Sequence, residues 1–177
     1  MTALDPAALD PAAEKALALK AAFMEAALAE SRRALPACRP NPPVGCVIVQ
    51  GEQIVARGFT GPPGQPHAEA AALAQLEGAS KEGLSAYVTL EPCSFARRTP
   101  SCALGLVAAG IRHVVVSVVD PHPRNQGRGL ELLRAAGVVV EVGLLEAKVR
   151  DFIAPYLIHW DDDEAARHPA PADKLPG

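Results

Sequence analysis

Three short runs rich in valine and other apolar residues most constrain the fold of this chain. They are SAYVTL at 85–90, HVVVSVV at 113–119 and VVVEVGL at 138–144, and segments with helical spacing separate them at 101–110 and 127–137. Strands that are apolar along their whole length and alternate with helices are typical of parallel strands buried on both faces and joined by right-handed crossovers. We therefore predict an α/β fold with helices on both sides of a sheet.

The first third of the chain predicts a long helix and two more strands. The helix should begin at Pro11, with Asp10 as its N-cap, and end by Leu35. Apolar runs at 44–50 and 53–59 flank a Gly-Glu turn and are typical of a hairpin. The expected architecture is a three-layer α/β/α sandwich with a five-stranded mixed sheet and an N-terminal hairpin.

The chain has the length of one domain. Its 177 residues are enough to bury a core without disulfides. We expect a flexible N-terminus at 1–10 and a domain at 11–160 whose last helix covers 146–160. The segment 161–177 is polar and contains prolines, so we expect a disordered tail.

Charge and composition argue against several classes of partner. The formal net charge is -3 and only 4% of residues are aromatic, whereas nucleic-acid binding usually needs a basic groove with stacking rings. No apolar segment approaches the roughly 20 residues that cross a bilayer, and the N-terminus lacks the pattern of a signal peptide. We expect a cytoplasmic protein that binds a small molecule, without a nucleic-acid or membrane partner.

Residues suited to chemistry lie at two junctions that lead into helices. The sequence PHAE at 66–69 precedes an alanine-rich helix. Cys93 directly follows a predicted strand and Pro92, and Cys102 begins the next helix, so we expect both thiols at helix N-termini. Loops at the carboxyl ends of parallel strands are the usual place for a site in such a sheet.

These residues predict a catalytic zinc site. His67, Cys93 and Cys102 offer three ligands to Zn²⁺, which keeps a fourth position for water and brings the pKa of that water towards about 7. Glu69 can reach this water from the first helical turn and pass its proton to a ring nitrogen and a leaving amine. A His-x-Glu followed by Pro-Cys and a second cysteine is the signature of zinc nucleobase deaminases, although eight residues separate the cysteines here instead of two.

Each piece of this pattern has a structural alternative. An isolated His-Ala-Glu is usually an exposed first turn of a helix, and cytosolic cysteines are usually small buried apolar residues. The joint occurrence of these pieces in the right order favours the zinc site. We expect Cys46 in the core and His113 and His159 in structural or surface positions, and leave the role of Cys38 open.

Several sequence blocks resemble one enzyme family. NPPVG, PHAE, AYVTLEPCS, RTPSC, AAGIRHVVV, DPHP, GRG and AAGVVVEVGLLE resemble the deaminase domain of bacterial riboflavin biosynthesis, a member of the cytidine deaminase superfamily. The long loop between the cysteines separates this group from tRNA-adenosine and cytidine deaminases. The resemblance implies a cytidine deaminase-like fold, zinc on His67, Cys93 and Cys102, and Glu69 as the proton shuttle.

The resemblance also implies a substrate. The reaction would be hydrolytic loss of the ring amino group from a phosphorylated ribosylamino diaminopyrimidinone. Asn41 would contact the pyrimidine and ribose, and Arg98 and Thr99 would help to hold the ligand. Asp120 and Arg128 would belong to another loop over the pocket, with a plain surface turn as the alternative.

Departures from the family pattern leave the substrate open. They fall at Phe95, Arg97, His122, Arg124 and Asn125. The same chemistry on another small pyrimidine, a nucleoside or a secondary-metabolite precursor is therefore an alternative. A nucleic-acid deaminase and a non-catalytic protein in which zinc supports folding are less favoured ones.

The resemblance suggests two protein partners. Relatives of this fold usually form dimers or tetramers, so we expect a homo-oligomer. No counterpart of the family's usual C-terminal reductase domain is expected after the last helix, so reduction would need a separate reductase.

Overall fold

The computed structural model describes residues 10–76, 80, 82–95 and 101–157. Several predictions lie outside these residues, namely those for the N-terminal residues 1–9, for Arg97, Arg98, Thr99 and His159, and for the tail at 161–177. Within the described ranges, no helix is both long and apolar enough to cross a membrane.

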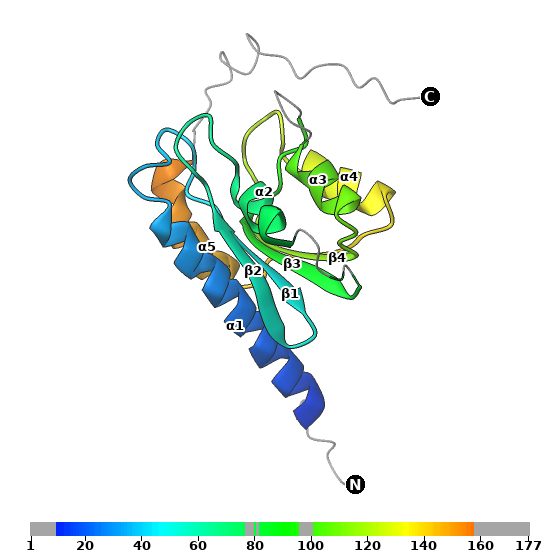
Figure 1. The fold of residues 1–177 in the computed structure, drawn as a ribbon. Coiled ribbons are helices and arrows are strands. Elements are labelled where there is room, and N and C mark those ends of the chain that lie inside the picture. Colours follow the sequence, from blue (N-terminus) through cyan, green and yellow to red (C-terminus); the bar gives the residue numbers. More distant parts are fainter. Residues whose placement is uncertain (1–9, 77–79, 81, 96–100, 158–177) are drawn as a thin grey trace, which may run out of the picture.

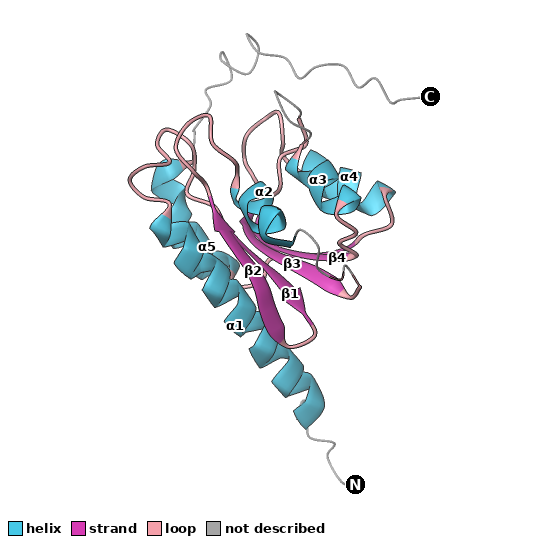
Figure 2. Cartoon of the chain, viewed as in Figure 1, coloured by secondary structure: helices cyan, strands magenta, loops and turns pink. Residues whose placement is uncertain are grey.

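A single mixed sheet of five strands organises the described residues (Figure 2). The strands lie in the order β2-β1-β3-β4-β5, where β1 is antiparallel to both β2 and β3, and β3, β4 and β5 run parallel. Their bounds are Gly45–Gln50, Gln53–Phe59, Leu84–Leu90, His113–Val118 and Val139–Val142 for β1 to β5. The predicted mixed sheet with an N-terminal hairpin is confirmed.

Helices cover both faces of this sheet (Figure 1). One face carries α1, Pro11–Arg33, and α5, Glu146–Ile153. The other carries α2, Ala68–Leu73, α3, Cys102–Ala108, and α4, Arg128–Ala135. Two short 3-10 helices, η1 at Ala74–Leu76 and η2 at Ala154–Tyr156, follow α2 and α5. The three-layer α/β/α arrangement is therefore confirmed.

The core divides into two halves because side chains alternate across each strand. On β1, Cys46 and Ile48 are buried in the half that α2, α3 and α4 cover. Val47 and Val49 are buried in the half that α1 and α5 cover. The prediction that Cys46 is a core residue is confirmed, since its exposed fraction is 0%.

The start of α1 follows its local sequence. Asp10 is the N-cap, and its side chain accepts a hydrogen bond of 3.3 Å from the backbone N–H of Ala12. Pro11 occupies the first turn, where its missing N–H costs nothing.

The last helix is shorter than predicted. The sequence predicts a helix over 146–160, but α5 ends at Ile153 and a 3-10 turn follows. Pro155 explains the difference because proline lacks the N–H that continues an α-helix and its ring clashes with the preceding turn.

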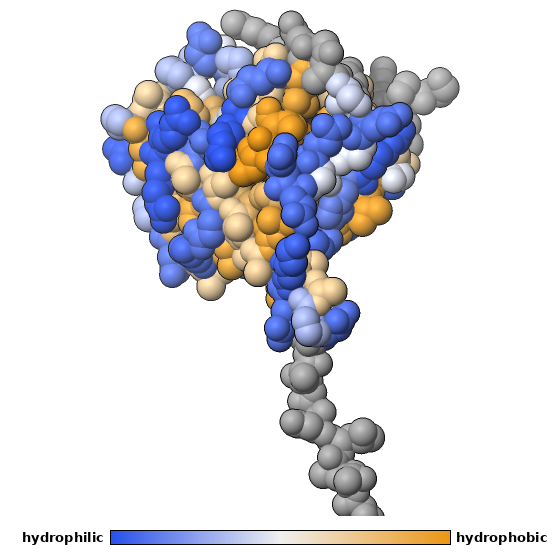
Figure 3. Space-filling view, turned by 60° about the horizontal axis from the view of Figure 1, so that its bottom comes forward, coloured by the Kyte–Doolittle hydropathy of each residue, from blue (hydrophilic) through white to orange (hydrophobic). Residues whose placement is uncertain are grey.

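The outermost strand β5 is less buried than predicted. Val139 and Val142 are 61% and 42% exposed, whereas β4 is buried along most of its length. The prediction of strands buried on both faces is thus wrong for β5, which has a neighbouring strand on one side only. Exposed apolar residues are not unusual on a folded protein, and Figure 3 shows hydrophobic surface beside hydrophilic surface on one face of the molecule.

Charged side chains tie α1 to the parallel part of the sheet. The ammonium of Lys20 lies 2.6 and 2.8 Å from the two carboxylate oxygens of Glu141 on β5. Nε2 of His113 on β4 lies 2.7 Å from the same carboxylate. Lys20, and then His113, hold the pKa of Glu141 below its usual value. His113 therefore has the structural position that the sequence suggested.

Candidate metal centre

Helix α2 brings His67 and Glu69 to one end of the sheet. His67 is the N-cap residue in extended conformation, and Glu69 lies in the first helical turn with only 3% of its surface exposed. The helix lies unusually close to β2, because a Cβ on Gly58 would be 2.2 Å from the carbonyl oxygen of Ala68. The alanines of PHAEAAAL keep this face thin enough for such an approach.

Both cysteines lie at the N-terminus of helix α3, but only Cys102 belongs to the helix. Cys102 is its first residue, after the N-cap Ser101, as the sequence predicted. Cys93 lies in an irregular segment after β3 and is not itself part of a helix. It still reaches the N-terminus of α3, because its Sγ accepts a 3.2 Å hydrogen bond from the backbone N–H of Cys102 and its carbonyl accepts one from Ala103.

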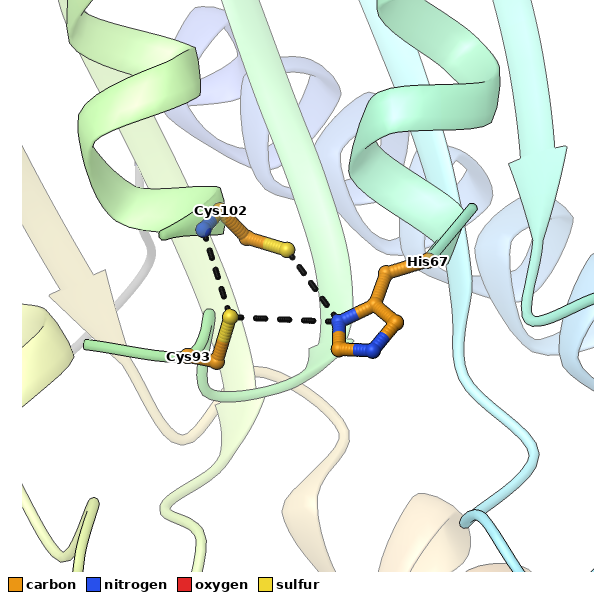
Figure 4. A group of neighbouring side chains, drawn as sticks. All are labelled: His67, Cys93 and Cys102. Atoms are coloured by element: carbon orange, nitrogen blue, oxygen red, sulfur yellow. Dashed lines mark hydrogen bonds between the residues drawn. The ribbon is translucent and has the colours of Figure 1, made fainter. Parts of the chain in front are cut away.

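The imidazole and both sulfurs converge (Figure 4). Nδ1 of His67 lies 3.8 Å from Sγ of Cys93 and 3.3 Å from Sγ of Cys102, and the three ligand atoms all lie within 4.8 Å of one another. Tetrahedral zinc, with bonds of about 2.3 Å to sulfur and about 2.0 Å to nitrogen, separates its ligands by about 3.5–3.8 Å. The donor set and its spacing therefore fit zinc.

The pKa values of the two thiols are shifted in opposite directions. A hydrogen bond from the Cys102 side chain, together with contacts to His67, lowers the pKa of Cys93 to about 5. The same pairing with Cys93, together with burial, raises the pKa of Cys102. One sulfur of the pair is therefore already a thiolate at neutral pH, which is the form that binds a metal ion.

The Glu69 carboxyl is shifted in the direction that proton transfer requires. Burial, followed by the nearby Cys93 sulfur, raises its pKa to about 7. A group with a pKa near the working pH can both accept and donate a proton. Glu69 supplies such a group beside the three converging ligand atoms.

Glu91 is a buried acid that the sequence analysis missed. It follows β3 and is 4% exposed, and its carboxylate accepts hydrogen bonds from the backbone N–H groups of Asp120, Gly127 and Gly129 at 2.9–3.1 Å. Burial raises its pKa. Glu91 directly precedes Pro92 and Cys93, so these hydrogen bonds tie the segment that carries Cys93 to the loop between β4 and α4. A charged residue directly after a buried strand is the signal that could have revealed it.

Three predicted substrate residues lie within the described ranges. Asn41 lines a hollow together with Arg39, Pro40 and the residues at 155–157. The Asp120 carboxylate accepts hydrogen bonds within its own loop, from the backbone N–H of His122 and the side chain of Asn125. Arg128 begins α4. Their contact with a substrate stays a prediction.

Comparison with known proteins identifies related sequences. A family model described as the cytidine and deoxycytidylate deaminase zinc-binding region matches residues 18–118. The riboflavin biosynthesis protein RibD of Haemophilus influenzae is 52% identical over 106 residues, which are 60% of this chain and 28% of that protein. The diaminohydroxyphosphoribosylamino-pyrimidine deaminase of Buchnera aphidicola (subsp. Schizaphis graminum) is 41% identical over 113 residues, which are 64% of this chain and 76% of that one. The chain therefore spans less than a third of the Haemophilus protein and most of the Buchnera one.

A solved structure has the same fold. It is the diaminohydroxyphosphoribosylaminopyrimidine deaminase/5-amino-6-(5-phosphoribosylamino)uracil reductase of Thermotoga maritima, with a TM-score of 0.74 and 36% sequence identity. The match covers 80% of this chain and 42% of the Thermotoga chain.

Proposed function

The chain belongs to the cytidine and deoxycytidylate deaminase zinc-binding family, and from this premise we propose that it is a zinc-dependent deaminase of a riboflavin-pathway pyrimidine. One observation carries the proposal: Nδ1 of His67 meets the sulfurs of Cys93 and Cys102 close to a buried carboxyl with a pKa of about 7. The name of the Haemophilus relative supports the choice of pathway, and the name of the Buchnera relative supports a pyrimidine as the substrate.

In the proposed reaction each residue has one role. His67, Cys93 and Cys102 hold the zinc ion, and a zinc ion bound there supplies a Lewis acid that can bring the pKa of water towards about 7. Glu69 takes a proton from the attacking water and delivers protons to a ring nitrogen and then to the departing amino group. The ring carbon gains a carbonyl oxygen and ammonia leaves.

The proposed substrate is the ribosylamino diaminopyrimidinone phosphate. Its chemical class is the one in the name of the Buchnera relative. Asn41, Arg98, Thr99, Asp120 and Arg128 are the proposed contacts to this molecule. Arginine side chains suit a phosphate because their planar fork of N–H groups can make paired hydrogen bonds to its oxygens.

A second candidate keeps the chemistry and changes the ring. The rings of Phe95 and His122 lie 6.3 Å apart at an angle of 39°, in the segments that follow Cys93 and Asp120. These are two of the positions that depart from the family pattern, and they link the two segments. A different small pyrimidine or nucleoside is the alternative substrate.

The proposed setting is the cytoplasm. All four cysteines are free thiols, which reducing conditions preserve. The product would pass to a reductase. The name of the Thermotoga relative pairs a reductase activity with the deaminase activity. Assembly into a homo-oligomer is also proposed.

An ammonia-release assay tests the function. Protein reconstituted with zinc would be incubated with the ribosylamino diaminopyrimidinone phosphate, its dephosphorylated form, cytidine and deoxycytidylate. We expect the phosphorylated diaminopyrimidinone to give the highest kcat/KM. Turnover of another pyrimidine alone would support the second candidate, and turnover of none, with zinc bound, would refute the enzymatic role.

A further inference from the structure

Asn125 is a fully buried polar residue to which the deaminase reaction assigns no role. Its exposed fraction is 0%, and it lies in the loop between β4 and α4. Its Oδ1 accepts a 2.9 Å hydrogen bond from the backbone N–H of Ser94. Its Nδ2 donates to the carbonyl oxygens of Glu91 and Pro92, each at 3.4 Å, and to the Asp120 carboxylate at 3.2 Å.

These hydrogen bonds lie on both sides of Cys93. The Pro92 carbonyl belongs to the peptide group before this cysteine, and the Ser94 N–H belongs to the peptide group after it. A carboxamide suits this position because it offers both donors and an acceptor. One side chain therefore fixes the direction of the backbone from which the Cys93 sulfur projects.

The loop that carries Asn125 is itself anchored. The Glu91 carboxylate accepts hydrogen bonds from the N–H groups of Gly127 and Gly129, which follow Asn125 in the sequence. A Cβ on Gly129 would lie 2.0 Å from the Pro92 carbonyl oxygen, so the start of α4 touches the backbone next to Cys93. The backbone on both sides of the loop that carries Asn125 is therefore held in place relative to Cys93.

We propose that Asn125 is a positioning residue for Cys93: its buried carboxamide brackets the cysteine backbone and presents the sulfur to His67 and Cys102 for binding a divalent metal ion. The inference rests on the proposed function only in using the same three metal ligands. Groups that orient metal ligands typically change metal affinity by about 10- to 100-fold when they are removed.

Ser94 offers a matched control. Its hydroxyl donates a 3.2 Å hydrogen bond to the carbonyl oxygen of Arg124 and so joins the same two loops. This bond involves neither of the two peptide groups that contain Cys93 atoms. Ser94→Ala therefore weakens the connection between the loops, whereas Asn125→Leu keeps the branch at Cγ but removes every hydrogen bond to the peptide groups on either side of Cys93.

The experiment measures metal release without any substrate. Wild type, Asn125→Leu and Ser94→Ala would be loaded with zinc and mixed with a chromophoric chelator, and the rate of transfer recorded. We expect release to be about 10- to 100-fold faster from Asn125→Leu, and unchanged for Ser94→Ala. Cobalt-loaded Asn125→Leu should also show a weakened thiolate-to-metal charge-transfer absorption, which a role in overall stability alone would not alter.

Each outcome decides the inference. Equal release rates and cobalt spectra for Asn125→Leu and wild type would overturn it. If Asn125→Leu does not fold by circular dichroism, Asn125→Ser takes its place, because a serine hydroxyl is too short to bridge both peptide groups. Wild type that binds no zinc would refute the metal site and the inference together, whereas tight zinc in every variant would refute the inference alone.

Discussion

Gly58 on β2 and Ala68 on α2 approach each other so closely that a Cβ at position 58 would lie 2.2 Å from the carbonyl oxygen of Ala68. It would also lie 2.6 Å from the backbone nitrogen of Ala72. Because both neighbours are backbone atoms, no side chain can rotate away. The helix that carries His67 and Glu69 therefore depends on this glycine for its distance from the sheet.

Gly58→Ala should displace α2 and disturb the site. We expect a loss of about 1–3 kcal/mol in the free energy of unfolding, as for overpacked cores, together with weaker zinc binding. Urea titration with excess chelator isolates the loss of stability from the effect on metal binding.

Gly105→Ala is the control, since the nearest neighbour of its new Cβ would be Leu73 Cδ1 at 4.0 Å. In a helix interior that change should stabilise the protein by about 0.5–1 kcal/mol, and equal behaviour of the two variants would contradict the packing argument.

Cys102→Ser should abolish stoichiometric zinc binding. Its sulfur lies 3.3 Å from Nδ1 of His67, whereas the sulfur of Cys46 belongs to the buried core. Cys46→Ala is therefore the matched control, which we expect to lose some stability and keep its zinc. Elemental analysis of the purified variants gives the metal content. Zinc retained in Cys102→Ser, or lost in a folded Cys46→Ala, would refute the assignment of ligands.

Glu69→Gln should separate metal binding from catalysis. The amide has the same shape as the carboxyl but cannot carry the proton, so we expect turnover to fall by roughly 100- to 10,000-fold while zinc content stays the same. The measurements are ammonia release and metal analysis on one preparation. A variant that retains turnover would exclude Glu69 as the proton carrier.

Glu141→Gln should change how stability depends on pH. Lys20 and His113 lower the pKa of Glu141, so its contribution is present above the unfolded pKa and is lost as the pH falls through the folded one. Because the side chain is 43% exposed, we expect wild type to be more stable by no more than about 1 kcal/mol at neutral pH, with the difference vanishing in acid.

Urea titrations of both proteins across this pH range provide the check. Glu52→Gln is the control, since the Lys15–Glu52 pair is 3.6 Å long and both side chains are largely exposed. We expect that variant to match wild type at every pH. A difference between Glu141→Gln and wild type that grows in acid would contradict the predicted sign.

Much of the fold could be predicted because its signals are local. Pro11 and Asp10 mark the start of α1, and the turn at Gly51 marks the hairpin. The end of α5 was predicted too late because the apolar spacing beyond Ile153 outweighed the breaking effect of Pro155. The exposure of Val139 depends on which strand lies outermost, which composition alone does not reveal.

The candidate site was partly predictable for the same reason. His67, Glu69 and the two cysteines carry chemistry in their side chains and lie at recognisable junctions. The part played by Glu91 was hidden, because its partners are backbone N–H groups 29 to 38 residues further along the chain. Such contacts exist only after the sheet has formed.

The convergence of His67 with the cysteines divides the site between two parts of the chain. His67 follows the hairpin in the sequence. Cys93 and Cys102 lie 26 and 35 residues further along the chain, after β3. A fragment that begins at β3 would keep both thiols without the imidazole, and one that ends before β3 would keep the imidazole without the thiols. Such halves, expressed separately, would form a working centre only by reassembling the sheet, so recovered metal binding on mixing would be a direct assay of fragment complementation.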